Sequence, residues 1–254
     1  MLRPPVVAGT FYEDDPHIIR EFVGSQEFST DSQARAVVVP HAGWIYSGRT
    51  ALKTLCRFPP MKGFIILGPN HRGFGGRMAL FPKNGVWQLP NGKALVSAHV
   101  NDFFLESMGN MISEDALAHS REHSIEVQLP FLIEMSKGDI EFCPISLFHS
   151  PLDVLDKLAI SIYEFLKENS DWGLIISSDF THYESAAEAA RKDHIAIENI
   201  LKGDGPGFLN AVRNEKISIC GAEAVYVLIK ASSLMQLKAE VVEYTNSGEV
   251  TGDS

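Results

Sequence analysis

Short apolar runs rich in valine and isoleucine recur along the chain, and several of them end at a proline, glycine or serine. Runs without alternation between apolar and polar residues are typical of strands buried on both faces, as in a largely parallel sheet. The pattern predicts six strands, at Ala36–Val39, Phe64–Leu67, Ile140–Leu147, Leu174–Ile176, Ile217–Ile219 and Val241–Tyr244.

Helical patterns occupy the intervals between these runs. The segment Leu152–Leu166 places apolar residues at helical spacing, with acidic residues and lysine between them. Strands that alternate with helices are typical of a layered α/β/α architecture. The predicted helices are Ser47–Phe58, Val100–Met108, Ser124–Ser136, Leu152–Asn169, Ser185–Leu201 and Ala222–Ala231.

The stretch Met78–Val96 has a different character. Its Asn84-Gly85 and Asn91-Gly92 pairs are turn signals that favour a β-hairpin or a similar excursion. The chain shows no internal repeat and no linker rich in proline, glycine and serine. We therefore predict one α/β domain over residues 1–254.

Composition narrows the classes of function. The chain has 254 residues, of which 45% are hydrophobic and 21% charged, and this is typical of a globular protein. Its formal net charge of −10 disfavours binding to nucleic acid or to an anionic membrane surface, so we expect small molecules or peptides as partners. Three cysteines, no signal-peptide pattern and no membrane-length apolar segment predict a cytoplasmic protein.

Candidate metal ligands follow the predicted strands directly. His41 and His71 come after the first two strands, Asp179 and His182 after the fourth, and Cys220 after the fifth. In open α/β sheets, ligand sites form at the carboxyl edge of the strands, where residues distant in sequence meet. We therefore expect these side chains to converge there.

The chemistry of this set favours a metal ion. Each residue alone is more often an ordinary loop or core residue, and Asp179 also suits a helix cap. Two neutral imidazoles and one anionic ligand leave coordination positions open, as in non-haem Fe(II) sites. Cys220 as the third ligand would soften the site and suit Zn²⁺ or copper. Asp179 and His182 would then orient ligands or act as a general acid or base.

A second concentration of polar residues spans His119–Pro130. Glu122 and Glu126 lie four residues apart, hence on one face if the segment is helical, and His123 is a candidate catalytic residue of the same pocket. The alternative is a solvated helix start with Ser124 as its N-cap. The remaining histidines outside these motifs, His17, His99, His149 and His194, are interpreted as surface or structural residues.

Three readings of the function remain open from the residues. The first is a metal-dependent redox or oxygenase-like enzyme. The second is a binding or scaffold protein for a peptide or small ligand, lined by Trp44, Tyr46 and Tyr183. The third is a hydrolase with Cys220 as its nucleophile. The sequence has no GxSxG, P-loop, GxGxxG or CxxC motif to support other classes.

At these same positions the sequence resembles the Memo family, and the likeness covers nearly the whole chain. The motifs that carry it are Arg3–Tyr12, Pro40–Gly48, Leu67–His71, Glu122–Pro130, Ser177–Tyr183, Ile219–Gly221 and Tyr244–Gly248. The resemblance implies a fold similar to class III extradiol dioxygenases, a three-layer α/β/α domain with a mixed, largely parallel sheet.

The resemblance also implies functional roles. His41, His71 and Cys220 take the metal-ligand positions, with Asp179 and His182 alongside. Since the dioxygenases use two histidines and a glutamate on Fe(II), Cys220 departs from their pattern. Fe(II) is the expected metal, with copper or zinc as alternatives.

Partners and chain length are implied as well. Microbial relatives often occur with an AMMECR-type protein and a radical-SAM protein, so participation in that system is expected here. Relatives usually continue into a last strand, so the resemblance leads us to expect either a longer chain or a member without that strand after Gly252–Ser254.

Overall fold

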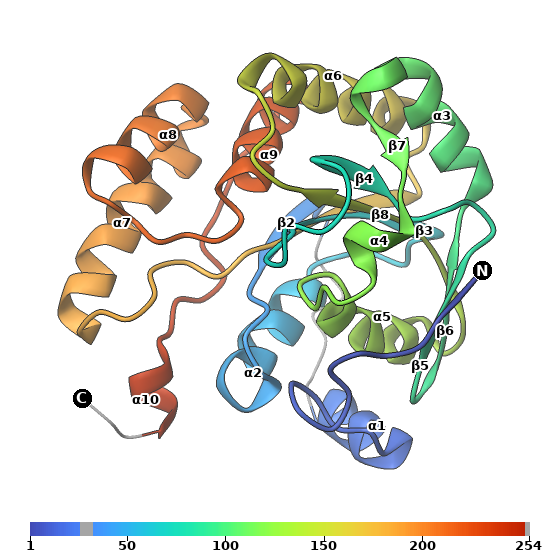
Figure 1. Ribbon diagram of the computed structural model, residues 1–254. Coiled ribbons are helices and arrows are strands. Elements are labelled where there is room, and N and C mark those ends of the chain that lie inside the picture. Colours follow the sequence, from blue (N-terminus) through green and yellow to red (C-terminus); the bar gives the residue numbers. More distant parts are fainter. Residues whose placement is uncertain (26–32, 252–254) are drawn as a thin grey trace.

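The protein is an α/β structure of three layers, a mixed and mostly parallel sheet with helices on both faces (Figure 1). The computed structural model describes residues 1–25 and 33–251. The predicted fold class is confirmed. The strands in the described part are β1 (Leu2–Arg3), β2 (Ala36–Val39), β3 (Gly63–Pro69), β4 (Met78–Leu80), β5 (Val86–Leu89), β6 (Gly92–Val96), β7 (Ser113–Glu114), β8 (Ile140–Leu147) and β9 (Trp172–Ser177).

The sheet order is β1-β5-β6-β8-β3-β9-β2, with β4 paired to β8 and β7. The central strands β8, β3, β9 and β2 are all parallel, and their registers join Ile65 to Cys143 and Leu174, and Val38 to Ile176. Because these strands run the same way, their carboxyl ends lie side by side at one edge of the sheet. The antiparallel pairs are β5 with β6 and β4 with β8.

Helices cover both faces of the sheet. The helices that the structure describes are α1 (Pro16–Gly24), α2 (Trp44–Leu55), α3 (Ala98–Met108), α4 (Ala116–His119), α5 (Leu129–Ser136), α6 (Leu152–Glu168), α7 (Ala186–Lys202), α8 (Gly205–Asn214), α9 (Ala222–Leu234) and α10 (Ser247–Thr251), with short 3-10 turns η1 (Gly109–Met111) and η2 (Glu126–Gln128). Helices α3, α6 and α9 pack on one face and α1, α2 and α5 on the other, while α7 and α8 lie at the left in Figure 1.

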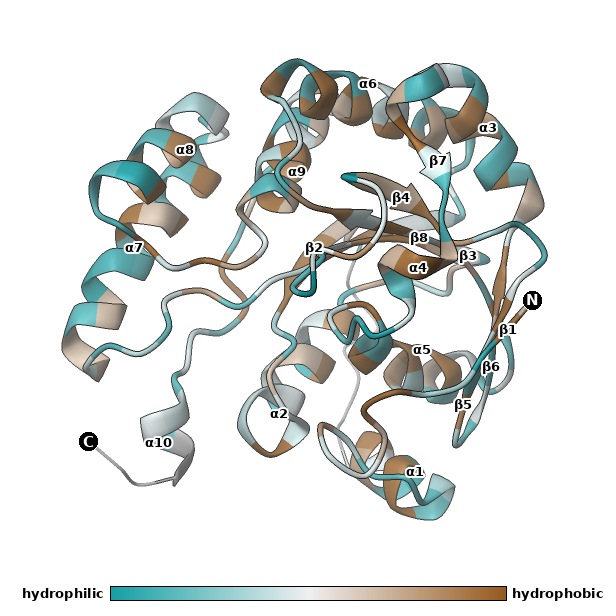
Figure 2. Cartoon of the chain, in the orientation of Figure 1, coloured by the Kyte–Doolittle hydropathy of each residue, from teal (hydrophilic) through white to brown (hydrophobic). Residues whose placement is uncertain are grey.

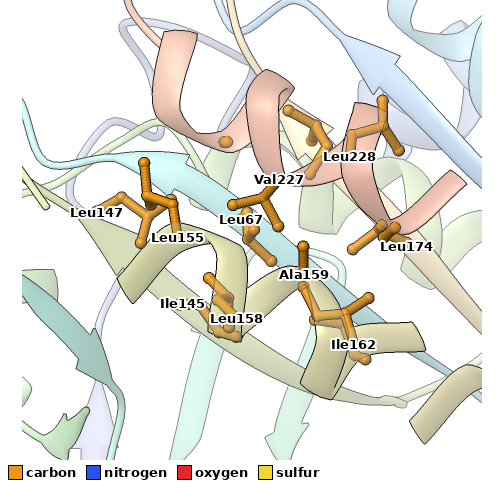
Figure 3. Packing of buried hydrophobic residues seen from close by; sticks show 14 of the residues in the cluster. Leu67, Ile145, Leu147, Leu155, Leu158, Ala159, Ile162, Leu174, Val227 and Leu228 are labelled. Atoms are coloured by element: carbon orange, nitrogen blue, oxygen red, sulfur yellow. The ribbon is translucent and has the colours of Figure 1, made fainter. Parts of the chain in front are cut away.

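The core consists of two apolar layers separated by the sheet. In β3, Ile65 and Leu67 face one layer, whereas Phe64 and Ile66 face the other, because successive side chains of a strand point to opposite faces. Figure 3 shows the first layer, where Leu158 and Val227 of α6 and α9 meet Leu67 and its neighbours. In Figure 2 the central strands are coloured mostly as apolar, whereas the helices that cover them carry both apolar and polar residues. Burial on both faces accounts for the unalternated runs of the sequence.

Two of the six predicted strands are wrong. Ile217–Ile219 and Val241–Tyr244 have no strand pairing in the structure. Ile217 and Ile219 are buried, at 5% and 7% exposure, against the face that α9 covers. Their apolar character therefore reflects burial of an irregular segment rather than membership of the sheet.

The hairpin prediction is confirmed for one of its two turns. The Asn91-Gly92 turn joins the antiparallel strands β5 and β6, with Gly92 at φ 155°. At Asn84-Gly85 the chain turns, with Asn84 at φ 58°, but it forms no hairpin there. Strand β4 pairs with β8 instead of β5, and β4 and β5 run in the same direction. In the described residues no helix has both the length and the apolar character needed to cross a membrane. From the family resemblance we expected either a longer chain or a member without the last strand after Gly252–Ser254. Residues 252–254 lie outside the described part.

Candidate metal centre

Three neighbouring parallel strands present polar side chains at one edge of the sheet. His41 follows β2, His71 follows β3, and Asp179 follows β9, which lies between β2 and β3. The convergence expected from the sequence is therefore present for these residues. The carboxyl edge of the sheet is a common place for ligand sites in open α/β proteins.

Three histidines form a compact cluster at this edge. One potential ligand atom from each of His41, His71 and His123 lies within 4.8 Å of the other two. The rings of His71 and His123 stack, with centroids 4.8 Å apart and planes at 22°. The ring of His41 is nearly perpendicular to both, at 82° and 89°. Imidazole nitrogens gathered in this way are suited to a transition metal ion.

Cys220 adjoins the cluster through His41. Its Sγ atom is 3.2 Å from His41 Nε2 and accepts a hydrogen bond from the backbone N–H of Asp179 at 3.1 Å. The residue lies in the irregular segment before α9, and close contact of Gly221 with Ser178 leaves no room for a side chain at position 221. Burial, together with the charge of Asp179, raises the pKa of the Cys220 thiol to about 12.

Glu122 orients His71 and the loop that carries His123. Its Oε1 accepts from His71 Nδ1 at 2.9 Å, and its Oε2 accepts from the His71 backbone N–H at 2.6 Å. The backbone N–H groups of His123 and Ser124 also donate to Oε1. Burial alone would raise the pKa of this carboxyl, but these partners lower it to about 2. A carboxylate behind a histidine is a common support for a metal ligand.

His41 is buried and neutral. Burial is the largest cause that lowers the pKa of its imidazole, to about 4. Its backbone N–H donates to Asp179 Oδ1 at 2.7 Å, and its ring Nδ1 lies 3.0 Å from Ser177 Oγ. The main chain and the ring of His41 are therefore both held by the end of β9.

Asp179 and His182 form a more open pair beside the cluster. His182 Nε2 is 3.8 Å from Asp179 Oδ2, and His182 Nδ1 donates to the carbonyl oxygen of Ser218 at 2.9 Å. Asp179 raises the pKa of His182. Burial opposes ionisation of Asp179, but His41 and His182 lower the pKa of its carboxyl to about 2. An acid-base pair thus lies next to the histidines, with the His182 side chain 33% exposed.

The loop that carries Glu122 and His123 is held by a buried ion pair. Arg3 Nη1 donates to Glu126 Oε2 at 2.6 Å, and Arg3 Nη2 donates to the carbonyl oxygen of Glu122 at 2.7 Å. The other carboxylate oxygen of Glu126 accepts from Tyr12 and from two backbone N–H groups of the N-terminal segment. Gly68 in β3 lets Ser124 approach, since a Cβ at position 68 would lie 2.6 Å from Ser124 Oγ.

A groove opens beside the acid-base pair. It has a volume of about 1280 Å³ and lies between β2, α2, α7 and the segment 237–248. Its lining includes Asp179 and His182, together with the aromatic residues Phe11, Tyr46 and Tyr183. Tyr183 is fully exposed and has φ 60°, a left-handed backbone that is uncommon for a residue with a side chain.

The structure brings together the whole set of predicted site residues, namely His41, His71, His123, Asp179, His182 and Cys220. Of the other five histidines, His17, His99, His149 and His194 are exposed elsewhere, and His119 is buried with its Nε2 near the Ala79 carbonyl oxygen. The position of Glu122 behind His71 was not predicted, although its place beside His123 was visible in the sequence. Ser124 is not a helix N-cap, because the segment begins with η2 and Ser124 Oγ donates to the Pro69 carbonyl oxygen.

Comparison with known proteins identifies relatives along the full chain. A family model described as Memo-like protein matches residues 3–254. Proteins named MEMO1 family protein are similar to this chain. The one from Desulfurococcus amylolyticus is 36% identical, covering 99% of this chain and 94% of the relative. Those from Thermoplasma volcanium and Aquifex aeolicus are 35% and 32% identical, covering 100% and 99% of this chain and 94% of each relative. The chain therefore belongs to the Memo family, as its sequence motifs indicated.

Proposed function

We propose that this protein binds a transition metal ion through His41, His71 and Cys220, and that it uses the ion in a redox or oxygenase-like reaction. The observation that carries the proposal is the meeting of three imidazoles within 4.8 Å, with a thiol 3.2 Å from one of them. Fe(II) is the first candidate, and copper and zinc are the alternatives that a sulfur ligand favours.

The donor set fits such an ion. Two ligands about 2.0 and 2.3 Å from one tetrahedral zinc ion lie about 3.5 Å apart, close to the 3.2 Å between Cys220 Sγ and His41 Nε2. Burial keeps His41 neutral, as a metal ligand must be. The Cys220 thiol loses its proton on binding a metal, in spite of its raised pKa.

The remaining residues supply acid-base chemistry. A bound ion of this type provides Lewis acidity or electron transfer. His182, which Asp179 favours in its protonated form, is placed to give a proton to a ligand in the groove. Asp179 also holds the backbone of His41, so that it links the acid-base pair to the metal ligands.

The direct test is metal analysis of protein purified without oxygen. We expect the wild type to hold close to one equivalent of iron, copper or zinc, and the His41→Ala/Cys220→Ser double variant to hold very little. A wild type with no more metal than this variant would overturn the proposal. A matched control is His99→Ala, since His99 is exposed on α3, lies near Phe165 and is not part of the histidine cluster.

His123 is a competitor for the third ligand position, because it belongs to the three-histidine cluster. If Cys220 is the ligand, His123→Ala retains the metal and a cobalt-substituted protein shows a thiolate-to-metal absorption band. If His123 is the ligand, Cys220→Ser retains the metal and no such band is seen. His123 then acts as a ligand rather than as the catalytic residue that the sequence predicted.

A second candidate function is peptide or small-ligand binding without catalysis, and the groove favours it. Small-molecule pockets usually have volumes of about 300–1,000 Å³, whereas this groove has about 1280 Å³ and an aromatic end at Tyr46 and Tyr183. A peptide-binding screen that responds to Tyr46→Ala but not to His41→Ala would place binding in the groove and not at the metal ligands.

Burial of Cys220 disfavours the third reading, a hydrolase with a cysteine nucleophile, although His41 Nε2 lies within hydrogen-bond distance of its sulfur. A nucleophilic cysteine needs a lowered pKa, but burial raises that of Cys220. Reaction of metal-free protein with a thiol-directed electrophile at neutral pH would restore this reading. Association with AMMECR-type and radical-SAM proteins stays a prediction from the family resemblance.

A further inference from the structure

The two nitrogens of a neutral imidazole are not equivalent, because one carries the proton and only the other has a lone pair for a metal. The Nε2 atom of His41 faces Cys220, and its Nδ1 atom faces Ser177. His41 therefore serves as a ligand beside Cys220 only when its proton is on Nδ1. The residues around Ser177 determine whether it is.

Ser177 has a single hydroxyl proton, and its direction is fixed. Ser177 Oγ lies 2.6 Å from the carbonyl oxygen of Ser124, and a carbonyl oxygen can only accept. The hydroxyl proton must therefore point to Ser124. Toward every other neighbour Ser177 Oγ acts as an acceptor.

Gln128 reinforces this direction. Its Nε2 donates one hydrogen bond to the carbonyl oxygen of Pro40 at 2.7 Å and another to Ser177 Oγ at 3.1 Å. Three residues of this network, Ser177, Ser124 and Gln128, are fully buried. Loss of one of these hydrogen bonds would therefore cost free energy, because water does not reach the group left without a partner. The contact of 3.0 Å between Ser177 Oγ and His41 Nδ1 is then a hydrogen bond in which the imidazole donates.

We propose that Ser177 is a positioning residue that holds His41 in the Nδ1–H tautomer, with Gln128 and Ser124 fixing the direction of its hydroxyl. This tautomer leaves the lone pair of Nε2 free on the side of Cys220. That the lone pair serves to bind a metal ion rests on the proposed function. Ser177 plays for His41 the part that Glu122 plays for His71. One imidazole is supported by a neutral hydroxyl and the other by a carboxylate.

The first test observes the tautomer in metal-free protein. Long-range proton–nitrogen NMR correlations of protein with labelled histidine distinguish a protonated Nδ1 from a protonated Nε2. We expect the wild type to show His41 as the Nδ1–H form at pH 7. We expect Ser177→Ala to show a mixture of tautomers or the Nε2–H form, and Ser177→Thr, which keeps the hydroxyl, to restore the wild-type signal.

The second test measures affinity for Zn²⁺ by calorimetric titration. Loss of a group that orients a metal ligand usually weakens metal affinity about 10- to 100-fold. We expect Ser177→Ala to fall in this range and Ser177→Thr to stay within about threefold of the wild type by the same principle. Ser161→Ala is the matched control, because Ser161 is also a buried serine but lies on α6 and contacts Met108 of α3.

The outcomes separate this inference from the proposed function. An Nε2–H tautomer of His41 in the metal-free wild type overturns the inference even if the protein binds Zn²⁺. An Nδ1–H tautomer that Ser177→Ala leaves unchanged overturns it as well. An Nδ1–H tautomer that depends on Ser177 supports the inference, even if no metal binds and the proposed function fails.

Discussion

The two sides of the candidate centre are built differently. On one side Glu122 and Glu126 are nearly fully buried, at 2% and 0% exposure, and each carboxylate is surrounded by hydrogen-bond donors. On the other side His182 is one-third exposed, and Tyr183 next to it is fully exposed with a left-handed backbone. One side is fixed by buried charge, and the other faces the groove.

This difference indicates that the two sides have different roles. Metal ligands need fixed positions, and buried charges hold them because any rearrangement would leave an ion without a partner. A group that exchanges protons with a ligand needs access to solvent and to the groove. We therefore expect changes on the buried side to affect stability and metal affinity, and changes on the open side to affect chiefly ligand binding and pH dependence.

The largest effect is expected from Glu126→Ala. This change leaves Arg3 buried without its partner and removes the acceptor of Tyr12, so the free energy of unfolding should fall by about 3–5 kcal/mol. Denaturation in urea measures it. As a control, Lys202→Ala removes an exposed pair with Glu198 and should cost less than about 1 kcal/mol. Equal losses in the two variants would contradict the stabilising role of the buried charge pair.

A slightly smaller loss of stability is expected at low pH, where Glu122 becomes protonated. The pKa of Glu122 lies near 2 in the folded protein against an ordinary value of 4.5. Its stabilisation is complete above pH 4.5 and is lost as the pH falls through 2. At about 1.4 kcal/mol per pKa unit, this amounts to about 3 kcal/mol. Urea denaturation between pH 7 and 2 should show Glu122→Gln less stable than the wild type at pH 7, with the gap closing near pH 2.

Two buried histidines should lower the free energy of unfolding at a higher pH than Glu122 does, in the same series of urea denaturations. The pKa values of His41 and His119 lie near 4 because of burial, against an ordinary value of 6.5. The unfolded chain therefore binds protons first, and stability should fall as the pH decreases from 6.5 to 4. A stability that is constant over this range would show that these imidazoles are solvated.

A small effect of opposite sign is expected on the open side. Asp179 raises the pKa of His182, so this pair stabilises the fold below pH 6.5 and loses its effect as the pH rises through the raised pKa. Because His182 is partly exposed, His182→Asn should cost less than about 1 kcal/mol even at pH 5.5. Metal content should not change. Loss of the metal in this variant would place His182 among the ligands.

The smallest effect is expected from Tyr183→Gly. Glycine adopts φ 60° without the cost that a side chain brings, but it loses more backbone entropy on folding, and the two nearly cancel. With a fully exposed ring, the free energy of unfolding should change by less than about 0.5 kcal/mol. A loss above 1 kcal/mol would indicate that the ring packs against the fold in solution.

The sequence predicted the central sheet well because its strands are buried on both faces. Ala36–Val39 and Ile140–Leu147 match β2 and β8 residue for residue. Ile217–Ile219 also has buried isoleucines but forms no strand pairing. Hydrophobicity reports burial, and burial occurs without strand pairing where an irregular segment passes under a helix.

The site was predictable where one polar residue follows a strand, as with His41 and His71. The supporting residues were not. Glu122, Ser177 and Gln128 act through partners about 50 residues or more distant in the chain, and no spacing in the sequence encodes those contacts. Arg3 and Glu126 belong to two family motifs, but only the folded chain brings them together.

The contact between Cys220 and His41 spans 179 residues. During synthesis on the ribosome, His41 and His71 emerge well before the sulfur atom, which follows His41 by 179 residues. A nascent chain therefore carries imidazoles without their anionic companion. With Cys220 as the third ligand, the complete ligand set exists only after this later segment has been made and folded against His41, so that loading reports on that folding step.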